Sequence, residues 1–198
     1  ISSYNSGLAI LAAVDADAGA AIYENEPLTS GIILSVGQAL DSAIINLEFS
    51  GFNTLSGLVN TTTSGLDESN FTSASWSVFA NARTSGLEVV SAVQTSGALV
   101  VYEDSPLSSG VITSVTNTIN SATSGLVFIN QQPLIDEVNL VSGLLESNFE
   151  ASEWPVFNSA LTSGLAIQTT INTDRGLANF DGSALSSGVI SDVTTALV

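Results

Sequence analysis

Cysteine, histidine and methionine are all absent from this chain of 198 residues. Without cysteine, the chain can form neither a disulfide framework nor a thiolate metal site. Without histidine, it lacks the usual general base near neutral pH and the commonest metal ligand. We therefore expect a protein that is not an enzyme and that uses no cofactor.

Positive charge is also nearly missing, because Arg83 and Arg175 are the only cations and the formal net charge is −17. The charged fraction of 11% is less than half of the usual quarter. Such an acidic surface repels nucleic-acid phosphates and anionic lipids. We therefore expect no nucleic-acid partner.

Long apolar runs are missing too, since none approaches the ~18–20 residues that a membrane-spanning helix needs. We expect no membrane span in this segment. Ile1 is not a start methionine and no basic signal-peptide region follows it, which suggests a processed chain or a piece of a longer one. Two trypsin sites and no easily oxidised sulfur suit an extracellular location, which we predict to be the cell surface.

The clearest pattern in the sequence is a repeat of about 78 residues. Leu-Asp-Glu-Ser-Asn-Phe at 66–71 returns as Leu-Leu-Glu-Ser-Asn-Phe at 144–149. Spacings of 79 and 78 separate Ser30, Ser109 and Ser187, which belong to a series that occurs three times. A fixed period of this size is typical of tandem arrays. It divides the chain into a partial repeat, 1–49, and two complete repeats, 50–127 and 128–198.

The best-defined helix of the repeat is predicted over 29–47. Apolar residues fall on one face of it at helical spacing, namely Ile33, Val36, Leu40, Ile44 and Leu47. Thr29 is the predicted N-cap, with Leu28 and Ile33 forming a hydrophobic staple around it. Ser108 and Ser186 are the N-caps in the later copies. A strand over 113–119 is the alternative on β propensity, but the helical spacing recurs in all three copies.

Two more helices precede this one in each complete repeat. One begins near Thr72 and runs to about Val93; its second copy begins between Glu150 and Ser152, which requires Pro155 to lie in the first turn. Gly97 and Gly19 are predicted to end this helix in the left-handed conformation. The first helix of each repeat carries the sets Leu55, Val59, Thr62, Leu66 and Leu134, Val138, Val141, Leu145.

The predicted fold class is therefore all-α, built of tandem three-helix-bundle repeats. The expected buried core of the second repeat consists of Leu55, Val59, Trp76, Phe79, Ile112, Val115 and Ile119. Twelve of the sixteen glycines directly follow a serine, and several of these pairs fall in predicted helices. Each interior glycine costs about 1 kcal/mol relative to alanine, and the sequence offers no reason for that cost.

The run from Asn70 to Phe79 resembles the start of the middle helix in FIVAR modules (Found In Various Architecture Regions), in which an aromatic residue, a threonine N-cap and a Ser-Trp-x-x-Phe run recur. Residues 134–137 with 145–147 resemble the first helix of that family and its exit, and 29–47 resembles the third helix. The resemblance implies a tandem three-helix stalk or adhesive region on a bacterial surface protein, sometimes associated with sugar or host-matrix binding. The Ser-Gly pairs, the lack of lysine and the longer connection before the third helix depart from the family pattern.

The connection before the third helix carries the candidate ligand site, because an aromatic residue lies beside carboxylates in each copy. The residues are Tyr23, Glu24 and Glu26; Tyr102, Glu103 and Asp104; and Phe180 and Asp181. Such a pair can bind a sugar or a cation. Alternatively, the aromatic ring anchors the connection to the core while its neighbours stay solvated.

Three other patterns have structural alternatives. Residues 15–19 resemble the opening of a calcium loop, but the further ligands and the closing glutamate are missing, so a helix end is favoured. Trp76 and Trp154 could stack on sugars, but their place four residues after an N-cap favours core packing. Asn60 and Asn70 begin N-glycosylation sequences, of which the first is the easier to modify.

These patterns predict a non-enzymatic extracellular structural repeat protein, a stalk or filament segment of a bacterial cell-surface adhesin. The alternative is a module that binds glycan or host matrix through the connections before the third helices. A third hypothesis is an accessory region of a secreted carbohydrate-active enzyme.

Self-association is the partner that we expect. The partial repeat has no first helix to cover its apolar face, which consists of Leu8, Ile33, Val36, Leu40 and Ile44. We predict that another chain or preceding residues fill this groove. A head-to-tail contact between repeats would not close on itself and would propagate into a filament.

Overall fold

The computed structural model describes residues 2–17 and 20–198, and these are mostly helical, which confirms the all-α fold class. The chain separates into two compact units, one of residues 1–52 with 89–109 and one of residues 53–88 with 110–198. Among the described residues, every helix is too short or too polar to span a bilayer, as expected.

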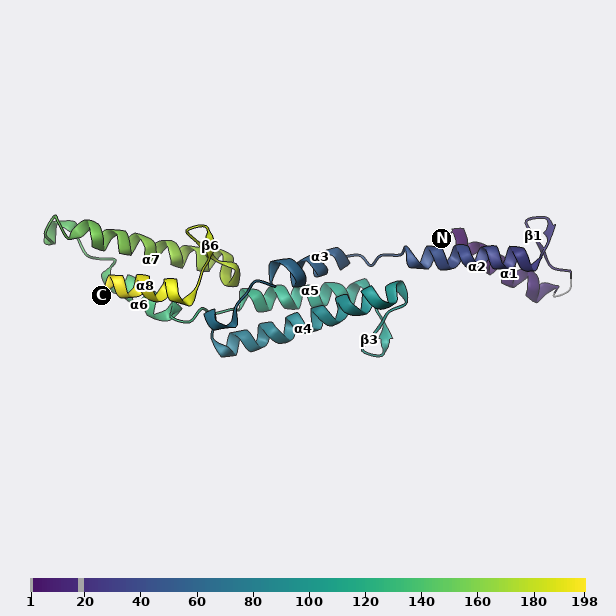
Figure 1. Cartoon of the computed structure of the whole chain (residues 1–198), viewed down its shortest axis with the longest axis horizontal. Coiled ribbons are helices and arrows are strands. Elements are labelled where there is room, and N and C mark those ends of the chain that lie inside the picture. Colours follow the sequence, from purple (N-terminus) through teal and green to yellow (C-terminus); the bar gives the residue numbers. More distant parts are fainter. Residues whose placement is uncertain (1, 18–19) are drawn as a thin grey trace. The chain divides into compact units, whose positions relative to one another are not determined.

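The first unit contains α1 (Ser2–Ala16) and α2 (Ser30–Ile45), which pack along each other (Figure 1). Between them in the chain lie β1 (Ile22–Tyr23) and β2 (Glu26–Pro27). The unit also holds the end of α4 (Ser73–Ser96), the 3₁₀ turn η3 (Gly97–Leu99), β3 (Val101–Tyr102) and β4 (Ser105–Pro106). No residue of α2 is fully buried.

The second unit begins with α3 (Phe52–Gly57), the π turn η1 (Leu58–Thr62), the 3₁₀ turn η2 (Glu68–Asn70) and the start of α4. After α5 (Ser109–Ser124) come α6 (Gln131–Val141), η4 (Glu146–Asn148), α7 (Trp154–Asp174), η5 (Arg175–Leu177), β5 (Asn179–Phe180), β6 (Ser183–Ala184) and α8 (Ser187–Leu197). The helices α6, α7 and α8 pack against one another, side by side in Figure 1.

The predicted N-caps of α2 and α8 are confirmed. The Thr29 hydroxyl accepts a hydrogen bond from Ile32 N at 3.3 Å, and the Ser186 hydroxyl accepts one from Val189 N at 3.2 Å. Each bond satisfies one of the four amide groups that a helix start leaves without an intrahelical partner. Residues 113–119 lie within α5, so the strand alternative is wrong.

The second helix of the repeat starts close to prediction in one copy and later in the other. α4 follows Thr72 and ends at Ser96. α7 begins at Trp154 rather than between Glu150 and Ser152, because Pro155 then falls in the first turn, where its missing N–H leaves no bond unmade. Gly97 has φ 55°, which confirms the left-handed helix end, whereas Gly19 lies outside the described residues.

The first helix of the repeat is regular in one copy only. α6 buries Leu134, Val138 and Val141 as predicted, but Leu145 lies beyond its end and is 61% exposed. In the other copy α3 widens into the π turn η1, where Thr63 N donates to Leu58 O at 3.0 Å. The π turn shifts the buried position by one residue, so Thr63 is buried instead of the predicted Thr62.

Most of the predicted core of the second repeat is fully buried: Leu55, Val59, Phe79, Ile112 and Ile119. Trp76, Val115 and Trp154 are only half-buried, so they are less buried than predicted, although each tryptophan packs on the phenylalanine before its helix as expected. Each indole stacks on one phenylalanine ring and packs at a tilt against a second.

Two glycines of Ser-Gly pairs have a packing reason. A Cβ on Gly86 would lie 2.6 Å from Ile119 Cδ1 and 2.7 Å from Val59 Cγ1. A Cβ on Gly164 would lie 2.8 Å from Val138 Cγ2. In both repeats the glycine therefore lets the first helix approach the second closely, which compensates its low helix propensity.

Candidate functional site

The predicted ligand residues lie on three small β-hairpins rather than on irregular loops. Each hairpin pairs two residues with two, as in Tyr23 with Glu26 and Phe180 with Ser183. Both residues at the tip have positive φ, including Glu24 (51°) with Asn25 (68°) and Asp181 (50°) with Gly182 (75°). Two consecutive positive φ values define the tight turn that matches the twist of a hairpin.

The three hairpins do not bring all eight predicted residues together. The first two hairpins belong to the first unit and the third belongs to the second unit. Tyr23, Tyr102 and Phe180 are half-buried, while the carboxylates of Glu24, Glu26, Glu103, Asp104 and Asp181 are exposed. At the first hairpin, Tyr23, Glu24 and Glu26 line one side of a shallow open hollow against the first turns of α2. Four of these acidic residues therefore form the hairpin turns, Glu26 lies in β2, and all five carboxylates are exposed to solvent.

An extensive polar arrangement joins the second and third repeats, inside the second unit. The segment that follows η2 runs antiparallel to residues 127–129 and forms a β-bridge between Phe71 and Phe128. Thr72 N donates to Val127 O at 2.9 Å, and Ile129 N donates to Asn70 O at 3.0 Å. We call this contact between residues 67–76 and residues 126–130 with Ser187 the repeat junction.

Asn70 is the central side chain of the repeat junction. Its Oδ1 accepts a hydrogen bond from Ser187 N, at the start of α8, at 3.0 Å. Its backbone carbonyl holds Ile129 in the segment between the repeats. Asn130, with φ 66°, donates from Nδ2 to Ser187 O at 3.4 Å. One asparagine of the second repeat therefore fixes both the entry into the third repeat and its last helix.

Aromatic rings close the same junction. Phe71 lies 4.6 Å from Phe128 and 5.9 Å from Trp76 between ring centroids, and Trp76 lies 5.0 Å from Phe79. Phe71 and Phe128 are 3% and 2% exposed. Offset aromatic pairs of this kind stabilise packing beyond the area that they bury.

A second contact lies at Gly176 in η5. A Cβ there would meet Leu126 Cδ1 at 2.6 Å and Thr123 O at 2.8 Å. The end of α5 thus lies directly against the backbone that connects α7 to β5. In the first unit η3 contacts α2, which is the same pair of elements one repeat earlier.

Asp67 caps η2 at the edge of the junction. Its carboxylate accepts a hydrogen bond from Ser69 N at 3.0 Å. The backbone N–H of Ser69, together with its hydroxyl, lowers the pKa of Asp67 below its usual value of 3.8. A lowered carboxyl pKa contributes stability at neutral pH, and that contribution is lost as the pH falls through the folded-state pKa.

The same motif recurs at residues 145–154 without these partners. Phe149 stacks on Trp154 at 5.7 Å and Trp154 on Phe157 at 5.3 Å, so the ring arrangement repeats. Phe149 is nevertheless 47% exposed. Within the part of the chain that the structure describes, no strand pairs with this copy of the motif, and the side chain of Asn148 makes no hydrogen bond.

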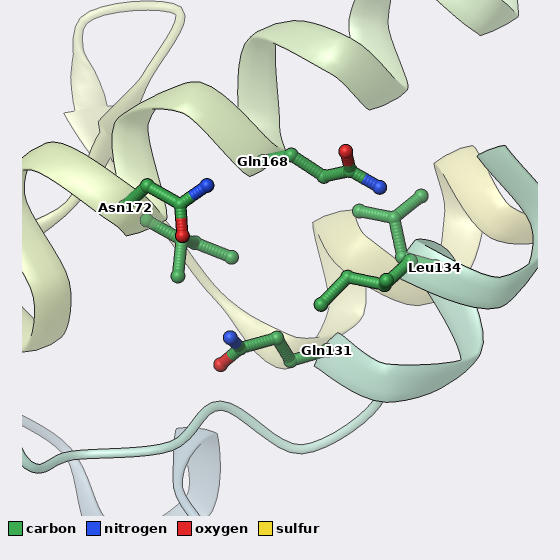
Figure 2. Close-up of a pocket in the computed structure, with 6 residues that line it drawn as sticks. Gln131, Leu134, Gln168 and Asn172 are labelled. Atoms are coloured by element: carbon green, nitrogen blue, oxygen red, sulfur yellow. The ribbon is translucent and has the colours of Figure 1, made fainter. Parts of the chain in front are cut away.

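A cavity of about 120 Å³ lies between α6 and α7. Figure 2 shows Gln168 and Asn172 of α7 facing Gln131 and Leu134 of α6 across it. Gln131 Oε1 accepts from Phe128 N at 3.3 Å, whereas Gln168 Nε2 is inaccessible to solvent and has no protein partner. A polar cavity of this size is large enough to hold a water molecule.

The described residues contain no cluster of three or more acidic side chains that could hold a metal ion. Asp15 lies in the last turn of α1 and Asp17 just beyond it, while the remainder of the calcium-like motif, residues 18–19, lies outside the described residues. Neither sequence comparison finds a matching protein family or curated protein, and no solved structure matches.

Proposed function

We propose that this chain is a non-enzymatic structural protein in which three-helix repeats are joined into a stalk on the surface of a bacterial cell. The repeat junction is the observation that supports this function. It links two successive repeats through backbone pairing, the Asn70 side chain and a buried aromatic pair, and a spacer needs such a link to hold its repeats in a fixed relation. The FIVAR resemblance and the extracellular location belong to the same proposal.

The coupling between repeats tests the proposed function. Repeats with a strong interface unfold together, whereas repeats with a weak one unfold separately. We expect the second unit of the intact chain, residues 53–88 with 110–198, to unfold in one calorimetric transition. Asn70→Ala removes the bond to Ser187 N and should split or broaden that transition.

Asn148→Ala is the matched control, because Asn148 occupies the same place in the motif and its side chain makes no hydrogen bond in the described structure. It should leave the transition unchanged. Equal effects of the two substitutions, or two independent transitions in the unaltered chain, would show that the repeats fold without coupling to each other. The stalk function would then be wrong.

Binding of glycan or host matrix is the second candidate function. The hollow beside Tyr23 and Glu26 favours it, because an aromatic face next to a carboxylate suits a sugar hydroxyl array. A glycan array probed with the unaltered chain and with Tyr23→Ala tests it. Loss of a specific signal in the variant would support binding at this hairpin; the absence of any specific signal would contradict it.

A further inference from the structure

The cavity between α6 and α7 is built by one face of each helix. The residues that line it are Gln131, Leu134 and Ile135 of α6 and Gln168, Ile171 and Asn172 of α7. In both helices the three residues follow the spacing i, i+3, i+4, which places them side by side on one face. Three amides and three aliphatic side chains therefore surround a space of about 120 Å³.

The amide of Gln168 is the least satisfied polar group of this cavity. Its Nε2 is inaccessible to solvent and has no partner in the described part of the chain. Figure 2 shows the side chain extending from α7 toward Leu134 of α6. A buried amide loses the hydrogen bonds that it makes with water in the unfolded chain, so an occupant that accepts a bond from Nε2 restores part of that loss.

The bundle itself does not require amides at these places. The second repeat has the buried Val90 where the third has Gln168, and it has Phe52 where the third has Gln131. The same helices are thus built with apolar side chains one repeat earlier. A local departure from good packing that lowers stability is typical of a functional site.

The charges around the cavity exclude an ionic ligand. No acidic side chain and neither arginine is among the described residues that line it. A buried ion would therefore have no counter-charge, which makes its transfer from water unfavourable. Gln131 uses its Oε1 to accept from Phe128 N, so its Nε2 remains as a donor beside that of Gln168. A matching ligand is neutral and carries acceptor oxygens.

The volume limits the ligand to one ring. The cavity is slightly smaller than the ~150 Å³ of an apolar cavity that admits benzene, and it is well below the roughly 300–1,000 Å³ of pockets for drug-sized molecules. Asn172 is exposed and Ile135 is half-buried, so the cavity opens to solvent on this side. The substituents of a six-membered ring can extend through this opening.

We propose that the cavity between α6 and α7 binds a neutral sugar ring. The apolar face of the ring packs on Leu134, Ile135 and Ile171. Its hydroxyl oxygens accept hydrogen bonds from the side-chain amides of Gln131 and Gln168. A free monosaccharide and the terminal ring of a glycan share this chemistry. The site is separate from the hairpin at Tyr23, and it does not rest on the proposed stalk function.

A nuclear magnetic resonance titration of the ¹⁵N-labelled 198-residue chain tests the proposal. The side-chain amide signals of Gln131 and Gln168 are followed while methyl glycosides of glucose, galactose or N-acetylglucosamine are added. We expect saturable shifts with at least one of them and a Kd of roughly 1 mM, since a single ring makes few contacts. A trisaccharide that ends in the same sugar then distinguishes the two sources, because only a glycan site binds it more tightly.

Gln168→Val introduces the residue of the second repeat and should weaken binding at least about tenfold, because a donor is lost and the cavity becomes apolar. A folding defect would not explain that loss, since removal of an unpartnered buried amide should stabilise the chain. Gln132→Ala is the matched control on α6, because Gln132 is exposed and lies outside the cavity. It should leave the Kd unchanged, and so should Tyr23→Ala.

The absence of saturable shifts up to ~100 mM of each glycoside would overturn the proposal and would mean that the cavity holds water alone. Equal binding by Gln168→Val would also overturn it, because the sugar would then bind elsewhere. Shifts of the same size with glycerol would show that no ring is selected, with the same conclusion. None of these results bears on the coupling of the repeats, which the Asn70→Ala and Asn148→Ala pair measures separately.

Discussion

The segment that opens the second repeat, from its first helix to the motif that follows it, is one residue longer than the same segment of the third repeat. Leu55 and Leu66 are one residue further apart than Leu134 and Leu144, although the flanking motifs match. In the third repeat the helix α6 is regular, whereas in the second repeat the extra residue appears as the π turn η1. A single inserted residue is thus absorbed within one turn, and the buried positions before and after it are preserved.

The two repeats also differ in the side chain that covers this turn. In a regular helix Val59 O would accept from Thr63 N, but here Thr63 N donates to Leu58 O. Arg83 Nη2 donates to Val59 O at 3.0 Å instead. The third repeat has Leu161 in the place of Arg83, and its first helix α6 contains no π turn whose carbonyl would need such a donor. The comparison shows that a backbone irregularity and a half-buried cation occur together.

The largest expected difference between the repeats concerns their junction phenylalanines. Phe71→Ala should lower the free energy of unfolding by about 3 kcal/mol, because a buried ring against Phe128 is lost. Phe149→Ala should cost less than about 1 kcal/mol, because half of that ring is exposed. Urea denaturation of both variants at low protein concentration measures this. Similar losses would mean that Phe149 is covered in solution as well.

The π turn and Arg83 should behave as a coupled pair. Arg83→Leu alone should destabilise by about 1.5–3 kcal/mol, because a hydrogen bond from a charged group is removed. Deleting Thr62 in the same variant restores the spacing of the third repeat and should return most of that loss. Urea denaturation of the single and combined variants gives the coupling. A combined variant less stable than Arg83→Leu alone would contradict the insertion model.

The smallest expected effect concerns the cavity between α6 and α7. Gln168 occupies the place that the buried Val90 has in the second repeat. Gln168→Val should raise the free energy of unfolding by about 1 kcal/mol, because it removes a buried amide without a protein partner. Val90→Gln should lower it by a similar or larger amount. A loss of stability in Gln168→Val would indicate that the amide is bonded to ordered water.

The sequence was sufficient for the helical class and for the caps at Thr29 and Ser186, since these depend on local spacing and on one side chain. It carried a signal for the hairpins that was overlooked. Asp181-Gly182 between short extended segments is a strong predictor of a tight hairpin turn, and Glu24-Asn25 has the same place in the first copy. Once Asp181-Gly182 identifies the third hairpin, the position of Glu24-Asn25 along the repeat, rather than its turn propensity, would have identified the first.

Other features could not be read from helical spacing. The π turn places Thr63 in the core where regular spacing requires Thr62, and only the one-residue difference between the two copies hints at it. Trp76 packs on Phe71 and Phe79, which are its neighbours in the chain, whereas Phe71 packs on Phe128 from a distant segment, and helical spacing does not indicate that contact. The role of Asn70 is likewise non-local, because its partner Ser187 is more than a hundred residues away.

The scarcity of cations has a consequence for proteolysis. A protease that cuts after arginine has two target bonds, and these differ in their accessibility in the folded chain. Arg83 lies inside α4 with its guanidinium held by Val59 O. Arg175 is exposed at the end of α7, with φ 54° in a turn. Cleavage of the folded chain would therefore occur after Arg175. It would separate residues 176–198, which contain β5, β6 and α8, from the rest of the chain.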